Sequence, residues 1–269
     1  MKFLVIGSNG SMGQRRIRDL KQLGHDVIGW DILDNTKLPI GEYDGVVVST
    51  PPDKHEEYMN FKIPTFVEAS ILPYDTKNSE HIYPSVTMRY HPIVIKMKEE
   101  QKQPLAFTYH VGNYLPDWHP TEDYTTKYFA KKATGGVREI VPYETSWMTW
   151  LWGPADCVSS EYFKLSNLKM DASDYYRFTL GFDANVIGNV QIDLLCRPKI
   201  RALRLIYEGD SEFIDMLRVN WEEMYLTEME TFVNAVRGGK YPYSVQEDLW
   251  NLKLLSEIEF GTVRAELDD

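Results

Sequence analysis

The chain has 269 residues, of which 43% are hydrophobic and 26% charged, the balance of a folded globular protein and not of a disordered one. This length predicts one large or two medium domains. The net charge of −11 argues against a nucleic-acid partner, because such a protein needs a basic face for the phosphates.

No apolar stretch approaches the roughly 20 residues of a membrane span, and the N-terminus lacks the apolar segment of a signal peptide. Cys157 and Cys196 form neither a CxxC pair nor a cluster with zinc-ligand spacing. We therefore expect a cytoplasmic protein with two reduced thiols, no membrane contact and no metal site.

Short apolar strands alternate with helices in the first third of the chain. The alternation predicts a parallel, doubly wound sheet with right-handed crossovers. The expected strands are 2–7, 25–31, 44–50, 64–70 and 84–90, and the expected helices are 12–23, a helix starting at 53, and 92–100.

The pattern changes near residue 104. Long alternating segments there predict an antiparallel sheet with one covered face. The expected strands are 104–114, 175–183, 185–197 and 201–209, and the expected helices are the later part of 137–153, 221–237 and 244–267. The predicted fold is α/β, with a Rossmann domain over residues 1–98 and a C-terminal α+β domain with an open, mainly antiparallel sheet over residues 99–269.

A glycine turn follows the first strand and opens the first helix, with the spacing Gly7-x-x-Gly10-x-x-Gly13. Gly7 permits a tight turn, Gly10 lets the backbone approach a pyrophosphate, and Gly13 lets helix and strand pack closely. The helix N-terminus offers free amides and a positive dipole end to the phosphates. The sequence therefore predicts a dinucleotide site built on residues Gly7, Ser8, Asn9, Gly10, Ser11, Met12 and Gly13.

Asp31 ends the second strand, 18 residues after Gly13. An acidic residue there can accept both ribose hydroxyls of NAD and would repel the 2′-phosphate of NADP. Arg15 or Arg16 would admit NADP if either offset this charge. The alternative is a structural glycine turn in an unrelated α/β fold, with Asp31 a solvated strand end.

Several stretches in order resemble the Gfo/Idh/MocA oxidoreductases. VVVSTPPDKHEEY (46–58) is similar to the family's third-strand motif, and FVEAS (66–70) stands where the family usually carries E-K-P. VTMRYHPIVIKMKE (86–99) and TGGVREIVPYETSWMTWLWG (134–153) are similar to two further family segments. The resemblance spans nearly the whole chain, since 201–216 and 232–255 also fit it.

The resemblance implies a nicotinamide held between the two domains and a hydride moved to or from a carbon of a sugar, inositol or nucleotide sugar. It implies a homodimer or homotetramer formed through the open sheet. It also adds cofactor contacts to the glycine turn and Asp31, namely Ser49, Thr50, Pro51, Pro52, His55 and Glu68.

The departures from the family pattern lie at its catalytic positions. Ala69 stands where the family has its lysine, Tyr143 where it has its histidine, and Ser146 where it has its aspartate. In ordinary members the lysine and histidine manage the hydroxyl proton. The proton therefore needs another carrier here, or the reaction differs.

Tyr143 and Glu144 are candidate carriers. A phenol can exchange a proton when a nearby cation lowers its pKa. Alternatively, Tyr143 belongs to a buried helix stripe with Trp147 and Trp150. Glu144 can act as a base or bind sugar hydroxyls, or it is a solvated residue without function.

The loop LPDWHPTEDY (115–124) supplies a third catalytic candidate, His119, whose ordinary pKa suits proton transfer at neutral pH. Trp118 can stack on a sugar ring and Asp117 can accept a sugar hydroxyl. The alternative is a rigid loop at a domain or subunit boundary.

Arg89 and His91 follow the fifth predicted strand, at the edge where doubly wound sheets bind ligands. Arg89 is suited to a carboxylate or phosphate on the substrate. An ion pair between domains explains it equally well.

Three functions fit these features. The first is an NAD-dependent oxidoreductase of a sugar-type substrate with a nonstandard acid–base group. The second is a non-catalytic NAD(H)-binding sensor or partner subunit. The third is a reductase of a C=N or conjugated bond, where solvent supplies the proton.

Overall fold

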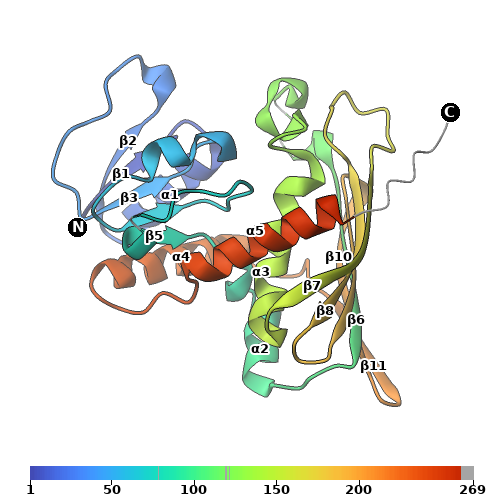
Figure 1. Cartoon of the computed structure of the whole chain (residues 1–269). Coiled ribbons are helices and arrows are strands. Elements are labelled where there is room, and N and C mark those ends of the chain that lie inside the picture. The colour runs from blue at the N-terminus through green and yellow to red at the C-terminus, as the bar shows by residue number, and fades with distance from the viewer. Residues whose placement is uncertain (78, 119, 121, 262–269) are drawn as a thin grey trace. The chain divides into compact units, whose positions relative to one another are not determined.

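A computed structural model describes residues 1–77, 79–118, 120 and 122–261. The chain divides into two compact units by its internal contacts. Among the described residues, the first unit comprises those from 1 to 90 and from 220 to 249, and the second comprises those from 91 to 219 and from 250 to 261. Figure 1 shows the helices and strands of both units and labels most of them.

The first unit contains a five-stranded sheet in the order β2-β1-β3-β4-β5, with every neighbouring pair parallel. The predicted Rossmann-type sheet is therefore confirmed. Its strands and its main helices are β1 (Lys2–Ile6), α1 (Ser11–Gln22), β2 (Asp26–Trp30), β3 (Gly45–Val48), β4 (Thr65–Val67), β5 (Ile82–Pro84) and α4 (Trp221–Val236).

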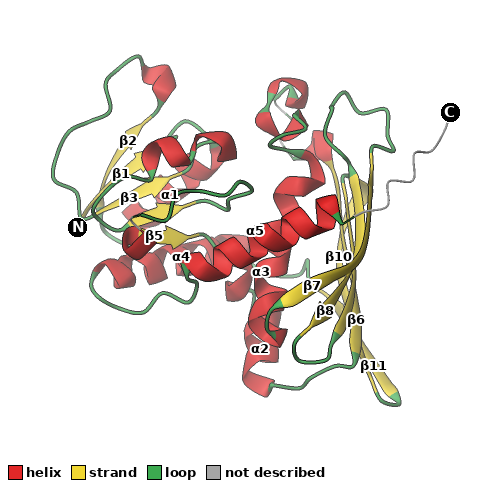
Figure 2. Cartoon of the chain, in the orientation of Figure 1, coloured by secondary structure: helices red, strands yellow, loops and turns green. Residues whose placement is uncertain are grey.

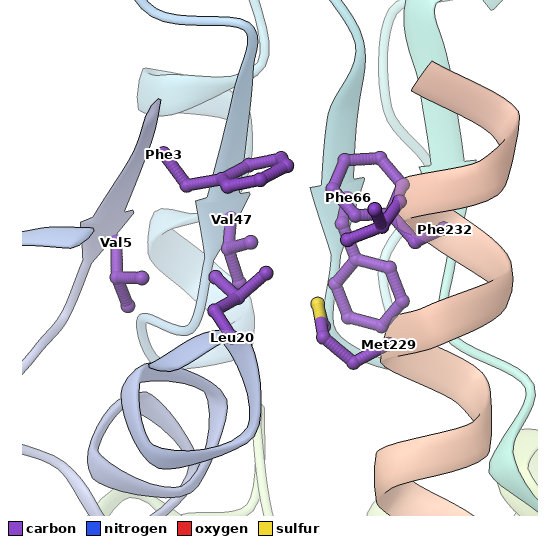
Figure 3. Close-up of a cluster of buried hydrophobic side chains, with 8 residues drawn as sticks. Phe3, Val5, Leu20, Val47, Phe66, Met229 and Phe232 are labelled. Atoms are coloured by element: carbon purple, nitrogen blue, oxygen red, sulfur yellow. The ribbon is translucent and has the colours of Figure 1, made fainter. Parts of the chain in front are cut away.

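The core of this unit joins the sheet to a helix from far along the chain. Figure 3 shows Met229 and Phe232 of α4 beside Phe66 of β4. The rings of Phe66 and Phe232 lie 5.5 Å apart, and both side chains are buried. Because α4 packs on the Rossmann sheet, the first unit is not contiguous in sequence, unlike the predicted domain 1–98.

Two predicted elements of the first unit differ from the structure. The segment expected to begin a helix at residue 53 forms two short 3-10 helices, Pro52–Lys54 and Glu56–Tyr58. The fifth strand lies earlier than predicted, at Ile82–Pro84, and Thr87–Tyr90 forms a 3-10 turn. β5 ends before Val86 because the Val86 amide donates to the carboxylate of Glu228 in α4 at 2.6 Å and is not used for pairing with a strand.

The second unit contains a six-stranded mixed sheet in the order β11-β10-β6-β9-β8-β7. Only the pair β6 and β9 is parallel among its described strands, so the expectation of a mainly antiparallel sheet is confirmed. Figure 2 distinguishes these strands from the helices. The elements are α2 (Pro92–Glu100), β6 (Ala106–Tyr114), α3 (Ile140–Trp152), β7 (Ala155–Phe163), β8 (Tyr175–Phe182), β9 (Ile187–Asp193), β10 (Leu195–Tyr207), β11 (Asp210–Asp215) and α5 (Val245–Phe260), which crosses the division between the units.

Aromatic side chains join α3 to one face of this sheet. The ring of Phe107 in β6 stacks on Trp152 of α3 at 4.5 Å, and Tyr109 meets Trp147 edge-on at 5.3 Å. Alternate residues of β6 point to the opposite face, where a hollow of about 870 Å³ is lined by sheet residues such as His110 and Gln191. The self-association expected through this sheet stays a prediction.

Within the described residues, no helix is long and apolar enough to cross a membrane.

Candidate functional site

The glycine turn of the first unit has the geometry that its spacing predicts. Gly7 has a φ of 84°, which favours glycine, and a Cβ there would lie 2.6 Å from the carbonyl oxygen of Ser49. A Cβ on Gly13 would lie 2.1 Å from the oxygen of Gly7, so only glycine allows α1 to approach β1. These two glycines fix the turn itself.

Gly10 differs from Gly7 and Gly13, because neither its backbone conformation nor its contacts require glycine. It precedes α1 in extended backbone with a φ of −72°, which any residue can adopt. A Cβ there would meet nothing closer than 3.4 Å, so the fold does not demand glycine at this position. No side chain caps the helix at Gly10, and the first turn of α1, which holds Ser11 and Met12, contains no acidic residue. The first amides of α1 are therefore available to an anion.

Asp31 lies beside this turn. Its carboxylate accepts the amide of Asn9 at 3.2 Å and the amide of Leu33 at 3.1 Å, so it links the glycine turn to the end of β2. Asn9 also donates its side-chain amide to Asp34 at 3.0 Å. The structure thus brings Asp31 to the site where the motif predicts it.

Arg15 and Arg16, the two candidates for neutralising the charge of Asp31, both pair with other carboxylates. Arg15 pairs with Glu222 at 2.9 Å, and Arg16 pairs with Glu68 at 2.7 Å and Glu228 at 2.8 Å. Among the described residues, no cation lies within ion-pair distance of the Asp31 carboxylate. Its negative charge is therefore available to ribose hydroxyls.

Glu68 holds the loop after β4 to the head of α1. Its two oxygens accept both Nε and Nη2 of Arg16, and Ser49 donates its hydroxyl to the same carboxylate at 3.2 Å. Arg16 is completely buried, and its guanidinium lies 4.7 Å from the ring of Phe66. Glu68 therefore links the segments after β3 and β4 to α1, next to the predicted cofactor site.

The segment after β3 leaves one polar atom without a partner. The hydroxyl of Thr50 is buried and makes no hydrogen bond within the described residues. The carbonyl of Thr50 accepts Nε2 of buried His55 at 2.9 Å, and Nδ1 of His55 lies 3.4 Å from the Ser70 hydroxyl. Burial lowers the pKa of His55, so the ring is neutral and holds this loop. Pro51 and Pro52 follow Thr50 and begin a 3-10 turn.

A second polar cluster lies in the second unit, at the start of α3. Glu144 is fully buried and pairs with Arg201 of β10 at 2.6 Å. Its other oxygen accepts the hydroxyl of Tyr109 at 2.7 Å and lies 3.4 Å from Nε1 of Trp147. Enclosed by these partners, Glu144 positions other groups and cannot itself meet a substrate.

Tyr143 lies next to this cluster and is only half-buried. Burial opposes the charge of Arg201, but the carboxylate of Glu144 and the phenols of Tyr109 and Tyr143 outweigh it and raise the pKa of Arg201. Arg201 is therefore a cation that lies close enough to Tyr143 to interact with it electrostatically.

The predicted residues of the loop after β6 are placed in part. Asp117 forms a two-point ion pair with Arg197 at 2.6 and 2.9 Å, and Trp118 packs edge-on against Phe129 at 6.1 Å. His119 lies outside the described residues. The loop therefore offers an aromatic ring and a carboxylate whose hydrogen bond to Arg197 lowers its pKa.

Arg89 and His91 both have structural partners. Arg89 is buried, pairs with Glu247 at 2.9 Å and donates to the carbonyl of Pro242. His91 is fully buried, accepts the amide of Ile93 at the start of α2 and contacts the carbonyl of Met216 at 3.0 Å. We therefore leave both side chains out of the proposed substrate site.

Glu139 is a titratable residue that the sequence analysis missed. Tyr128 donates to its Oε1 at 2.7 Å, whereas its Oε2 is buried without a hydrogen bond to any described residue. Burial raises the pKa of Glu139 to about 7, although the Tyr128 hydrogen bond opposes the shift. No spacing in the sequence marks such a residue, because its burial arises only when the chain is folded.

Replacing Glu139 by glutamine should stabilise the protein at alkaline pH but not at acid pH. The native pKa lies above the ordinary value, so stability falls as the pH rises from about 4.5 to about 7 and the penalty is complete above that range. Glutamine keeps an acceptor for Tyr128 and removes the penalty, a gain of up to about 3 kcal/mol. Thermal unfolding at pH 5 and pH 8 measures this gain, and an equal change at both pH values would contradict it.

No protein-family model matches the chain, and no curated protein matches it. Solved structures do match over nearly its full length. A probable dehydrogenase from Thermotoga maritima has a TM-score of 0.78 at 15% identity, covering 96% of each chain. The WlbA dehydrogenase from Bordetella pertussis, in complex with NADH and UDP-GlcNAcA, has a TM-score of 0.77 at 14% identity, covering 96% of this chain and 94% of that one.

GenD2 from gentamicin A biosynthesis, in complex with NAD, has a TM-score of 0.76 at 16% identity, covering 97% of this chain and 95% of that chain. At these identities the comparisons establish the fold. The fold expected from the Gfo/Idh/MocA resemblance is confirmed, since these dehydrogenases share it across both units.

Proposed function

We propose that this protein is an NAD-dependent oxidoreductase that moves a hydride between the nicotinamide and a hydroxyl-bearing carbon of a sugar or nucleotide sugar. The observation that carries the proposal is the glycine turn. No side chain caps the N-terminus of α1 there, and the Asp31 carboxylate beside the turn forms no ion pair with a described residue. The full-length likeness to dehydrogenases whose structures hold NAD or NADH supports it.

The residues of the first unit fit a dinucleotide. Gly10 has no side chain, so the space beside the N-terminus of α1 stays open for a ligand. In the loop after β3, the Thr50 hydroxyl makes no hydrogen bond with a described residue. The first amides of α1 would hold the diphosphate, and Asp31 would hold the adenosine ribose. Asp31 favours NAD over NADP, because a carboxylate repels the 2′-phosphate. When bound, the cofactor supplies the hydride acceptor or donor.

We further propose that Tyr143 carries the hydroxyl proton. It is half-buried, whereas its neighbour Glu144 is enclosed by Arg201 and Tyr109. Arg201 favours the negative charge that the Tyr143 oxygen carries before it accepts a proton and after it donates one, and Glu144 holds Arg201 in place. His119 is the competing proton carrier. Trp118 and Asp117 are proposed to contact the sugar.

The substitution Gly10→Ala tests the cofactor site. The new methyl group meets only ordinary contacts in the folded protein, so the thermal unfolding temperature should change little. The same methyl enters the space proposed for the diphosphate, so calorimetry should show binding of NAD⁺ and NADH by the natural protein and weak or absent binding by the variant.

NADP⁺ serves as the matched ligand in that titration and should bind more weakly than NAD⁺. Absence of heat with both NAD⁺ and NADH would overturn the proposed function. Firm binding of NAD⁺ without turnover across a broad sugar panel would instead favour the non-catalytic sensor. The sequence observation in favour of that sensor is Ala69, which stands where the family has its lysine.

A further inference from the structure

Three side chains of types that can ligate a metal ion converge on the six-stranded sheet, outside the residues of the proposed oxidoreductase site. His110 lies in β6, Asp193 ends β9 and Cys196 lies near the start of β10. One donor atom from each residue lies within 4.8 Å of the others. These strands are neighbours, because β6 lies between β10 and β9 in the sheet.

The carboxylate at the centre of this cluster is rigidly held. Its Oδ2 lies 2.7 Å from Nε2 of His110, and Leu195 donates its amide to Oδ1 at 3.1 Å. The side chain of Asp193 is only 3% exposed. Gln191 places its Nε2 3.2 Å from both the His110 nitrogen and the Asp193 oxygen. The site is therefore largely preformed, and Gln191 contacts two of its donor atoms.

The backbone makes room for the thiol. Gly112 lies opposite Cys196, and a Cβ on this glycine would stand 2.6 Å from Sγ. Any other residue at position 112 would displace the sulfur from the cluster. The glycine therefore fits a requirement for Cys196 at this place.

The cysteine is not arranged as a nucleophile. Its thiol hydrogen-bonds the carboxylate of Asp193. Nucleophilic cysteines have a lowered pKa and a neighbouring cation or base that takes the proton. A thiol that faces a carboxylate and an imidazole is suited to share a cation with them.

We propose that His110, Asp193 and Cys196 bind one Zn²⁺ ion. A nitrogen, an oxygen and a sulfur donor match zinc, whereas magnesium and calcium take oxygen ligands only. On binding, the thiol releases its proton to solvent and the neutral His110 ring carries its hydrogen on Nδ1, so that Nε2 faces the ion. Three protein ligands leave the fourth tetrahedral position to water.

This site is not evident from the sequence, because zinc motifs are recognised by short spacings. Residues 110 and 193 are brought together by parallel pairing of β6 with β9, in which His110 lies opposite Gln191. The proposal departs from the expectation, drawn from those spacings, that the chain holds no metal site. The proposal is independent of the NAD-dependent function.

Cobalt provides the test, because a thiolate bound to Co²⁺ gives a charge-transfer band in the near ultraviolet. The full-length protein, reduced and stripped of metal, is titrated with Co²⁺ and then with Zn²⁺. We expect the band to saturate at one Co²⁺ per chain and to be bleached by one equivalent of Zn²⁺. Added Mg²⁺ should not bleach it.

Cys157 is the matched control, because it is the other free cysteine and lies in β7. Cys157→Ser should keep the band, whereas Cys196→Ser should abolish it. Gln191→Ala should keep it with zinc affinity lowered about 10- to 100-fold, the usual effect of losing a group that orients a ligand. Asp193→Asn gives a second ligand test and should weaken zinc binding more than Gln191→Ala.

Absence of the band in the natural protein would overturn the proposal. So would a band that survives Cys196→Ser, or one that is lost equally in both cysteine variants. Because the readout is the metal spectrum, neither NAD nor a substrate is needed, and failure of the proposed oxidoreductase function would leave this result unaffected.

Discussion

Replacing Glu228 by alanine is expected to destabilise the first unit by about 3 to 5 kcal/mol, the usual effect of removing one partner of a buried ion pair. Glu228 is fully buried and binds Arg16 of α1 at 2.8 Å. It also accepts the amide of Val86 and the hydroxyls of Ser85 and Thr87. The substitution removes one of the two carboxylates that pair with the buried Arg16 guanidinium, and it takes away the acceptor of three further hydrogen-bond donors.

Glu222 is a matched control on the same helix. It pairs with Arg15 and Arg18, but its side chain is 59% exposed. Exposed pairs contribute at most about 1 kcal/mol, so Glu222→Ala should change stability little. Chemical denaturation followed by circular dichroism compares the two variants. Similar losses in both would show that burial of the Arg16 ion pairs does not govern stability here.

Much of the fold follows from short-range patterns. The run of apolar residues in β3 is buried on both faces, which predicts a central parallel strand. The alternation in β6 and β8 predicts a sheet with one covered face. These elements were predictable because their burial repeats along the chain itself.

The division into units was not predictable in the same way. α4 is amphipathic, and its sequence shows a buried face, but not which sheet that face covers. Phe232 meets Phe66 across 166 positions of sequence, and only the assembled structure shows this contact. The strands β7 and β11 were also missed, since their residues are mostly exposed or half-buried and lack an apolar period.

The candidate cofactor site was largely predictable, because its glycines and Asp31 lie in one strand–turn–helix–strand segment. The partners of the polar residues were not. Glu144 meets Arg201, and Arg16 meets Glu228, across long stretches of sequence. A charged residue in a sequence shows that a partner is needed when it is buried, but not which residue supplies the opposite charge.

Replacing Tyr143 by phenylalanine is expected to lower kcat by about 10² to 10⁴, the usual contribution of a general acid or base. Phenylalanine keeps the ring and its packing and removes only the hydroxyl. Because the proposed role is proton transfer and not binding, KM for the sugar and the affinity for NAD⁺ should change much less than kcat. Steady-state kinetics with a sugar that the natural protein oxidises measures both.

Two comparisons separate this role from a structural one. Tyr162→Phe, in β7, is a matched removal of a phenol hydroxyl and should leave kcat unchanged, because the Tyr162 ring packs on Tyr176 at 5.3 Å in either form. Arg201→Lys keeps the positive charge beside Tyr143 but not the planar guanidinium that meets Glu144, so it should lower kcat less than Tyr143→Phe and alter its pH profile. If Tyr143→Phe keeps full activity while His119→Ala loses it, the proton belongs to the loop after β6, and the cluster of Glu144, Arg201 and Tyr109 serves only to hold α3 on the sheet.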